Sequence, residues 1–169
     1  MKLLKTENNL PTRKPTRLKE FDYSQSGYYF VTICSKGKGK IFGKIVGGGA
    51  FDAPKINLSK IGKIVEKYIL STNNIPEIKV DNFIIMPNHI HLILAVENSG
   101  TSRAPSPTNN AVSHSISTFK RFVNKEIGQN VFQRSFYDHI IRNEKDYLEI
   151  WNYIDTNPQK WEEDCFYSN

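Results

Sequence analysis

Hydrophobic residues occur along the chain in short runs that predict strands and in longer periodic stretches that predict helices. The first strand is expected over residues 28–34, where aromatic and β-branched side chains follow one another up to a lysine- and glycine-rich cluster at 36–40. Residues 41–46 and 51–58 predict a hairpin, because the three glycines at 47–49 suit a turn. This first part of the chain is therefore expected to be β-structure.

A helical period begins after the hairpin. Ser59 is a suitable N-cap, and the helix is expected to stop near Asn73 or Asn74. Apolar residues recur there with the spacing of one helix face, at Ile61, Ile64, Val65, Tyr68 and Ile69. Such a stripe is typical of a helix that packs against a sheet.

Two further strands are predicted over 78–86 and 89–96. Only Pro87 and Asn88 connect them, and so short a link requires antiparallel pairing. The second strand is apolar on both faces, so we expect it at the centre of the sheet.

The second half of the chain predicts a loop, a helix, a strand and a last helix. Residues 97–112 are rich in Ser, Thr, Pro, Asn and Gly and predict a flexible loop, either functional or a tolerated insertion. A helix is expected from Ser113 or Ser115, and a strand with an irregular entry over 131–142. The second helix has an expected apolar face of Ile116, Phe119, Phe122 and Val123. The last helix is expected between Asn143, a good N-cap, and Pro158.

This order of elements contains too few alternating strand and helix units for a doubly wound fold. It predicts an α+β fold, an antiparallel sheet with helices packed against it. We expect one domain over 21–169, preceded by a basic N-terminal arm at 1–20.

Composition adds a first functional indication. The 169 residues carry a formal net charge of +6 and a pI near 9.2, which suits a polyanionic partner but also occurs in proteins without one. The chain has no apolar run that would serve as a secretory signal or a membrane span, so we expect a cytoplasmic protein without a membrane partner.

Two histidines are the first candidates for chemistry. Alternate residues of a strand share a face, so His89 and His91 present their imidazoles side by side. A bound metal ion or phosphate would account for two polar groups on a central strand. The alternative, two histidines that hydrogen-bond to neighbouring protein groups, stays open at this stage.

The last helix presents a second pair of candidates. Tyr153 and Asn157 are four residues apart and so share one face, one turn apart. They lie at the border of the helix's core stripe of Tyr147, Ile150, Trp151 and Ile154, and could face the histidines. A divalent ion there would assist attack by a tyrosine oxygen on a phosphodiester, without a nucleotide cofactor. A boundary core tyrosine remains the alternative for Tyr153.

These residues are part of a wider resemblance. The run 83–94, FIIMPNHIHLIL, and the run 153–158, YIDTNP, resemble the single-tyrosine HUH transposases, and specifically the REP-associated tyrosine transposase branch. The resemblance covers nearly the whole chain, with earlier and later marks at 21–23, 27–34, 132–134 and 137–143.

The resemblance implies a ferredoxin-like domain that cleaves single-stranded DNA next to a hairpin. In such enzymes cleavage leaves a 5′-phosphotyrosine and uses Mg²⁺ or Mn²⁺. Carried over to this chain, it makes Tyr153 the nucleophile and His89, His91 and Asn157 the metal ligands. His139 matches a recurring family position, but no role is assigned to it. Both monomers and homodimers occur among relatives.

Several cations are candidates for DNA contacts, although each alone could equally be a solvated charge. They are Arg13, Lys14, Arg17, Lys120, Arg121, Arg134 and Arg142. A histidine-triad hydrolase is excluded because Ile93 stands where the third histidine would be. The remaining rival is a domesticated protein that binds hairpin DNA without cleaving it, and the complete set of catalytic residues favours the nuclease.

Overall fold

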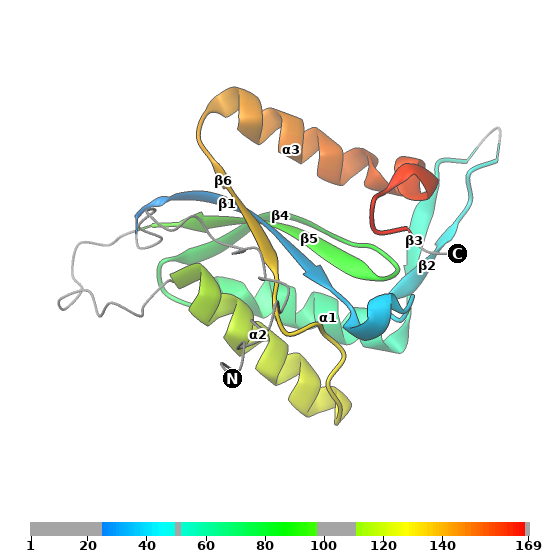
Figure 1. The fold of residues 1–169 in the computed structure, drawn as a ribbon, viewed down its shortest axis with the longest axis horizontal. Coiled ribbons are helices and arrows are strands. Elements are labelled where there is room, and N and C mark those ends of the chain that lie inside the picture. The colour runs from blue at the N-terminus through cyan, green and yellow to red at the C-terminus, as the bar shows by residue number, and fades with distance from the viewer. Residues whose placement is uncertain (1–24, 50–51, 98–110, 168–169) are drawn as a thin grey trace, which may run out of the picture.

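The structure, a computed structural model, describes residues 25–49, 52–97 and 111–167. Its centre is a four-stranded antiparallel sheet in the order β4-β5-β1-β6, with helices on both faces (Figure 1). The strands are β1 Gly27–Cys34, β4 Ile78–Ile85, β5 His89–Val96 and β6 Tyr137–Ile141. The α+β fold and the antiparallel pairing predicted from the sequence are confirmed.

Three α-helices and a small hairpin complete the fold. The helices are α1 Lys60–Ser71, α2 Ala111–Ile127 and α3 Glu144–Thr156. The hairpin consists of β2 Gly43–Val46 and β3 Lys55–Leu58, and short 3-10 helices span Lys36–Lys38, Thr72–Asn74 and Asn157–Glu163. Helices α1 and α2 cover one face of the sheet and α3 covers the other (Figure 1). Among the described residues, no helix has the length and apolar character needed to cross a membrane.

The predicted helix caps are present. The Ser59 Oγ accepts a hydrogen bond from the Gly62 amide at 3.0 Å, and the Asn143 Oδ1 accepts one from the Asp146 amide at 2.9 Å. Each bond satisfies an amide that the first helical turn leaves without an intrahelical partner. These caps set the starting points of α1 and α3, and therefore the phase with which each helix meets the sheet.

The alternation of side chains along β5 divides the core into two layers. Ile90, Leu92 and Leu94 pack in the larger cluster with residues of α1 and α2. Ile93 packs in a smaller cluster with Ile154 and other α3 residues. Since alternate residues share a face, His89 and His91 point toward α3, and all eight residues of β5 are buried. The predicted central position of this strand is confirmed.

The structure differs from the sequence predictions at three boundaries. Helix α2 begins at Ala111, inside the predicted loop 97–112, because Val112 is buried in the core. Strand β6 covers only part of the predicted range 131–142. Pro158 does not end the helical structure, because α3 is followed directly by the 3-10 helix Asn157–Glu163. The arm at 1–20 and residues 98–110 of the loop lie outside the described residues.

The prediction that Phe122 belongs to the apolar face of α2 is wrong. Its side chain is 42% exposed and stacks on Tyr68 of α1 at a ring-centroid distance of 5.9 Å. The buried stripe of α2 consists of Val112, Ser115, Ile116, Phe119 and Val123. Both Phe122 and Val123 have helical spacing from Phe119, at three and four residues. The helical period alone therefore does not decide whether Phe122 or Val123 faces the sheet.

Candidate active site

His89 and His91 meet on the face of β5 that α3 covers. Their Nε2 atoms are 2.9 Å apart, and both side chains are almost completely buried. Two lone pairs that point at each other repel unless a proton or a cation lies between them. Either a proton on one Nε2 or a cation bound by both would relieve this repulsion, so the pair is a candidate cation site.

The other ring nitrogen of each histidine has an oxygen partner. The His89 Nδ1 lies 2.8 Å from the Asn88 Oδ1, and the His91 Nδ1 lies 2.9 Å from the Thr32 Oγ1. The Asn88 Nδ2 donates to the Phe166 carbonyl at 2.7 Å, which fixes the orientation of the amide. Because the Asn88 Oδ1 can only accept, His89 carries its proton on Nδ1, and its Nε2 lone pair is available to a metal.

Burial keeps both imidazoles neutral. It lowers the pKa of His89 to about 4, although the nearby Asp164 carboxylate opposes this shift. Burial, together with the charge that His89 would carry, lowers the pKa of His91 well below its usual range. A neutral imidazole is the form that binds a metal ion, so the pair is ready to bind one at neutral pH.

Tyr153 of α3 reaches the histidine pair. Its hydroxyl lies 3.3 Å from the His91 Nε2 and 3.4 Å from the Asp164 Oδ2. The residue is 38% exposed, so part of the tyrosine lies open to solvent. Burial and the Asp164 carboxylate raise the pKa of Tyr153 to about 12. The hydroxyl therefore needs a neighbouring positive charge to become a phenolate near neutral pH.

Asp164 is a site residue that the sequence did not predict. Its side chain is only 2% exposed, and its Oδ2 lies 3.8 Å from the His89 Nε2. Donor atoms of His89, His91 and Asp164 all lie within 4.8 Å of one another. Two imidazole nitrogens and a carboxylate oxygen form a donor set that suits a divalent ion. The 3-10 helix that follows α3 brings Asp164 back to the histidines, and no period in the sequence indicates this return.

Asn157, the predicted third ligand, lies nearby. It is 2% exposed, and its Oδ1 has no hydrogen-bond partner among the described residues. Its side chain hydrogen-bonds to Tyr153 and favours the ionised form of the phenol. A buried amide oxygen without a partner is costly, and a ligand would remove that cost. The role of Asn157 as a metal ligand remains a prediction.

The predicted basic and histidine candidates are spread over both faces of the sheet, and Arg121 lies on α2, opposite the histidines (Figure 1). Arg121, Arg134 and Arg142 are exposed. The Lys120 Nζ donates to the Gln133 and Ser135 carbonyls at 2.8 and 3.0 Å, so it already holds the segment that leads to β6. His139 is exposed and hydrogen-bonds to Asp146 at 3.0 Å. Three candidates, Arg13, Lys14 and Arg17, lie outside the described residues.

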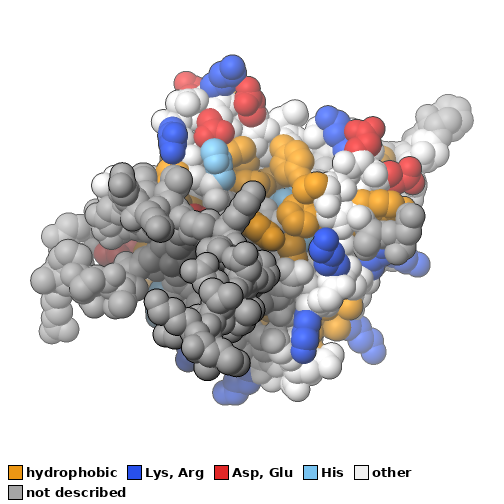
Figure 2. Space-filling model, in the orientation of Figure 1, with side chains coloured by type: hydrophobic (Ala, Val, Ile, Leu, Met, Phe, Trp, Pro, Cys, Tyr) orange, Lys and Arg blue, Asp and Glu red, His pale blue; other side chains and the backbone are white. Residues whose placement is uncertain are grey.

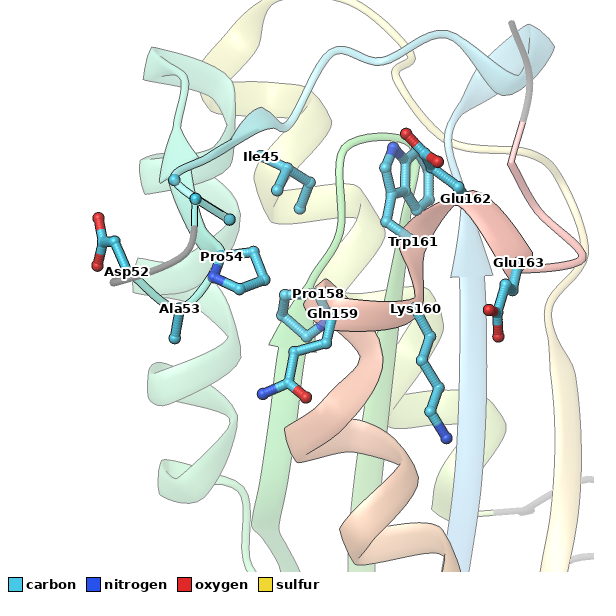
Figure 3. A pocket seen from close by; sticks show the side chains of 13 residues that line it. Ile45, Asp52, Ala53, Pro54, Pro158, Gln159, Lys160, Trp161, Glu162 and Glu163 are labelled. Carbon is cyan, nitrogen blue, oxygen red and sulfur yellow. The ribbon is translucent and has the colours of Figure 1, made fainter.

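A groove of about 900 Å³ is lined by Trp161 and by residues of the β2–β3 hairpin and of the 3-10 helix after α3 (Figure 3). The Trp161 ring stacks on His89 at a centroid distance of 5.9 Å and also lines the groove, between the β2–β3 hairpin and the 3-10 helix. Among the described residues that line the groove, the carboxylates are those of Asp52, Glu162 and Glu163, and the one cation is Lys160. Because these carboxylates would repel phosphates, the groove is a poor path for DNA.

No family model matches the chain. A relative nevertheless shows the family to which it belongs. A Haemophilus influenzae protein of uncharacterized function is 33% identical over an alignment of 176 positions, which covers 92% of this chain and 93% of that protein.

The structure also resembles a REP-associated tyrosine transposase solved with a bound REP hairpin, with a TM-score of 0.59 and 19% identity. The similarity covers 80% of this chain and 68% of the transposase. It confirms, at the level of the fold, the resemblance inferred from the sequence. The chain belongs to the same family as the Haemophilus influenzae protein and has the fold of the REP-associated tyrosine transposase.

Proposed function

We propose that the chain is a metal-dependent, transposase-like endonuclease and strand transferase that acts on single-stranded DNA. The observation that carries this proposal is the position of the Tyr153 hydroxyl, 3.3 Å from the His91 Nε2 and next to the His89, His91 and Asp164 cluster. A tyrosine nucleophile beside a candidate cation site is the arrangement that phosphodiester cleavage through a phosphotyrosine requires.

The residues present fit a divalent ion, Mg²⁺ or Mn²⁺. His89 and His91 would supply nitrogens, Asp164 a carboxylate oxygen, and Asn157 its partnerless buried oxygen. When bound, the ion would neutralise charge on the nonbridging oxygens of the scissile phosphate. Asn88 and Thr32 are positioning residues, since each holds the Nδ1 of a histidine ligand.

The chain's own chemistry is a single displacement. The Tyr153 oxygen attacks the phosphorus, a new O–P bond forms, and the bond to the leaving 3′-oxygen breaks. The Tyr153 proton leaves with solvent, and the 3′-oxygen takes up a proton. The 5′-phosphate then remains on the tyrosine, so a second 3′-hydroxyl can attack it in reverse and join a new strand. Because one phosphodiester replaces another, the step needs no nucleotide cofactor.

The substrate is proposed from the fold. The REP-associated tyrosine transposase, which has the same fold, was solved with a bound REP hairpin. We infer that this chain also recognises a DNA hairpin and cleaves the single strand beside it, with Arg134 and Arg142 as candidate phosphate contacts. The basic residues of the arm, Arg13, Lys14 and Arg17, are proposed as further contacts.

The proposal is tested with a labelled hairpin oligonucleotide that carries single-stranded flanks. Wild-type protein and Mn²⁺ are expected to produce a covalent protein–DNA band that survives SDS, together with a free 3′-hydroxyl product. Tyr153→Phe should bind the DNA but form no adduct, whereas the matched control Tyr68→Phe, on α1, should react like the wild type. Binding by wild type and Tyr153→Phe alike, without cleavage by either, would favour the pure DNA-binding protein instead.

A further inference from the structure

We propose that the turn at 35–40 and Tyr137 of β6 bind the single strand next to Tyr153. In this view Lys36, Lys38 and Lys40 contact consecutive backbone phosphates, and the Tyr137 ring stacks on a base. This inference rests on the proposed function and deepens it, because it assigns the surface that holds the substrate strand.

The turn continues the strand that supports the histidines. Cys34 and Thr32 of β1 pair directly with His89 and His91 of β5. The Ser35 amide donates to the Asn88 carbonyl at 2.9 Å, and the Asn88 Nδ2 lies 3.4 Å from the Lys38 carbonyl. Asn88 therefore links the turn to His89, whose orientation it sets. Figure 1 shows the turn at the same end of the sheet as the β4–β5 connection and the C-terminal segment.

The three lysines of the turn are free to bind an anion. All three are exposed, and none forms an ion pair with a described residue. Burial raises the pKa of the Cys34 thiol, and Lys38 partly offsets this, so its ammonium lies near the buried end of β1. The Lys40 Nζ lies 5.0 Å from the centre of the Tyr167 ring, close to the segment that covers the histidines.

The backbone of the turn has a defined conformation at Lys38. Its φ is 59°, in the left-handed region that glycine adopts readily and other residues adopt at a cost. The Ser35 Oγ donates to the Gly39 carbonyl at 2.8 Å, so the turn has a defined internal bond. These bonds hold the turn in one conformation, so the positions of its three lysines are set by the fold.

Tyr137 supplies the aromatic surface that single-strand binding also requires. It lies opposite Thr32 across the β1–β6 pairing, on the edge strand, and is 53% exposed. Its ring centre is 6.4 Å from that of Phe166, which is 4.7 Å from that of His89. Figure 2 shows hydrophobic side chains open to solvent in the region between α3 and the sheet, with Lys and Arg side chains close by. Lysines beside an exposed ring are typical of surfaces that bind single strands.

The lysines are tested by the salt dependence of binding. Binding of a fluorescent single-stranded oligonucleotide is measured by anisotropy in EDTA, at several salt concentrations. For the variant Lys36→Gln/Lys38→Gln/Lys40→Gln we expect at least ten-fold weaker binding and a slope of log affinity against log salt that is smaller by about 2, since each single-strand phosphate contact contributes roughly 0.7.

A charge-matched control separates local from general electrostatics. The variant Lys60→Gln/Lys63→Gln/Lys125→Gln removes three exposed lysines from α1 and α2, on the other face of the sheet. We expect its slope to stay within about 0.5 of the wild type. Equal losses in the two triple variants would overturn the assignment. If the first triple unfolds, single substitutions should each lower the slope by about 0.7, and an unchanged slope in all three would overturn it as well.

The stacking contact is tested by two substitutions at one position. Tyr137→Ala removes the ring and should weaken binding about ten-fold, whereas Tyr137→Phe keeps the ring and should bind like the wild type. Wild-type affinity in Tyr137→Ala, or an equal loss in Tyr137→Phe, would contradict base stacking.

The binding assay also separates this inference from the proposed function. EDTA prevents metal-dependent cleavage, so the assay does not depend on attack by Tyr153. If the wild type forms no covalent adduct but the turn variants still lose affinity selectively, the nuclease proposal is wrong and the strand-binding surface stands. If the adduct forms while turn and control variants bind equally well, the strand-binding surface is wrong and the nuclease stands.

Discussion

The Asn88 Oδ1 accepts a hydrogen bond from the His89 Nδ1 at 2.8 Å, while the Asn88 Nδ2 donates to the Phe166 carbonyl at 2.7 Å. One buried amide thus fixes the tautomer of a candidate metal ligand and fastens the C-terminal segment beside it. Hydrogen bonds of this kind raise the affinity of a histidine site for its metal by orienting the ring.

Asn88→Ala is therefore expected to weaken Mn²⁺ binding by about ten- to a hundred-fold, the usual effect of losing the partner of a histidine ligand. Isothermal titration calorimetry without DNA measures this directly. The matched control is Asn152→Ala, an exposed asparagine of α3, which should bind Mn²⁺ like the wild type. Unchanged affinity in Asn88→Ala would show that this amide does not position His89 for a metal.

Asp164 and Asn157 can be ranked as metal ligands by the same titration. Asp164→Ala is expected to weaken Mn²⁺ binding at least ten-fold, because it removes a carboxylate within reach of both histidines. Asn157→Ala should have a smaller effect, and Glu163→Ala, an exposed neighbour, should have none. Loss of binding in Asn157→Ala with unchanged binding in Asp164→Ala would identify the amide as the oxygen ligand instead.

Because of Lys120, the free energy of unfolding is expected to increase with pH in the alkaline range. Burial lowers the pKa of Lys120 from 10.5 to about 8 in the folded state. Between these values the unfolded chain binds the additional proton, so the free energy of unfolding rises with pH in this window. From pH 7.5 to 9.5 the wild type should gain about 1 to 2 kcal/mol from this group.

Urea denaturation of Lys120→Met at both pH values should lack this gain. Lys125→Met, on the exposed side of the same helix, should retain it. The difference between the two variants removes the contribution of all other titrating groups. An equal pH dependence in both variants would contradict the assignment to Lys120.

Gly62 should not tolerate alanine although it lies in a helix. Gly to Ala in a helix interior ordinarily stabilises a protein by about 0.5 to 1 kcal/mol. Here an added Cβ would lie 2.0 Å from the Phe42 carbonyl oxygen, which also accepts a hydrogen bond from the Ser59 amide. We expect Gly62→Ala to destabilise the fold by about 3 kcal/mol, measured from urea unfolding. Gly49→Ala, with open space around it, should be near neutral, and an increase in stability of Gly62→Ala would refute this packing.

The main elements of the site could be predicted because they depend on short-range periods. The two-residue period of β5 places His89 and His91 on one face, and the Asn143 cap sets the start of α3. The phase of α3 then places the Tyr153 hydroxyl 3.3 Å from His91. Each of these steps uses geometry that is repeated along a regular element.

Other site residues depend on contacts that no local period encodes. Asp164 reaches the histidines only because the chain reverses after the 3-10 helix, and the length of that helix is not indicated by its residues. The sequence indicates that Asn88 is a turn residue, but no local pattern indicates its hydrogen bond to His89. Thr32 offered a usable signal, because it is a polar residue within an otherwise apolar buried strand, and such a residue requires a hydrogen-bond partner.

The central claim is that Tyr153 becomes covalently attached to DNA, and peptide mapping of the adduct tests it most directly. Wild-type protein is incubated with Mn²⁺ and a hairpin oligonucleotide, digested with nuclease and protease, and analysed by mass spectrometry. A nucleotide joined through its 5′-phosphate to Tyr153 is the predicted result. An adduct on any other residue, or cleavage without an adduct, would contradict the account.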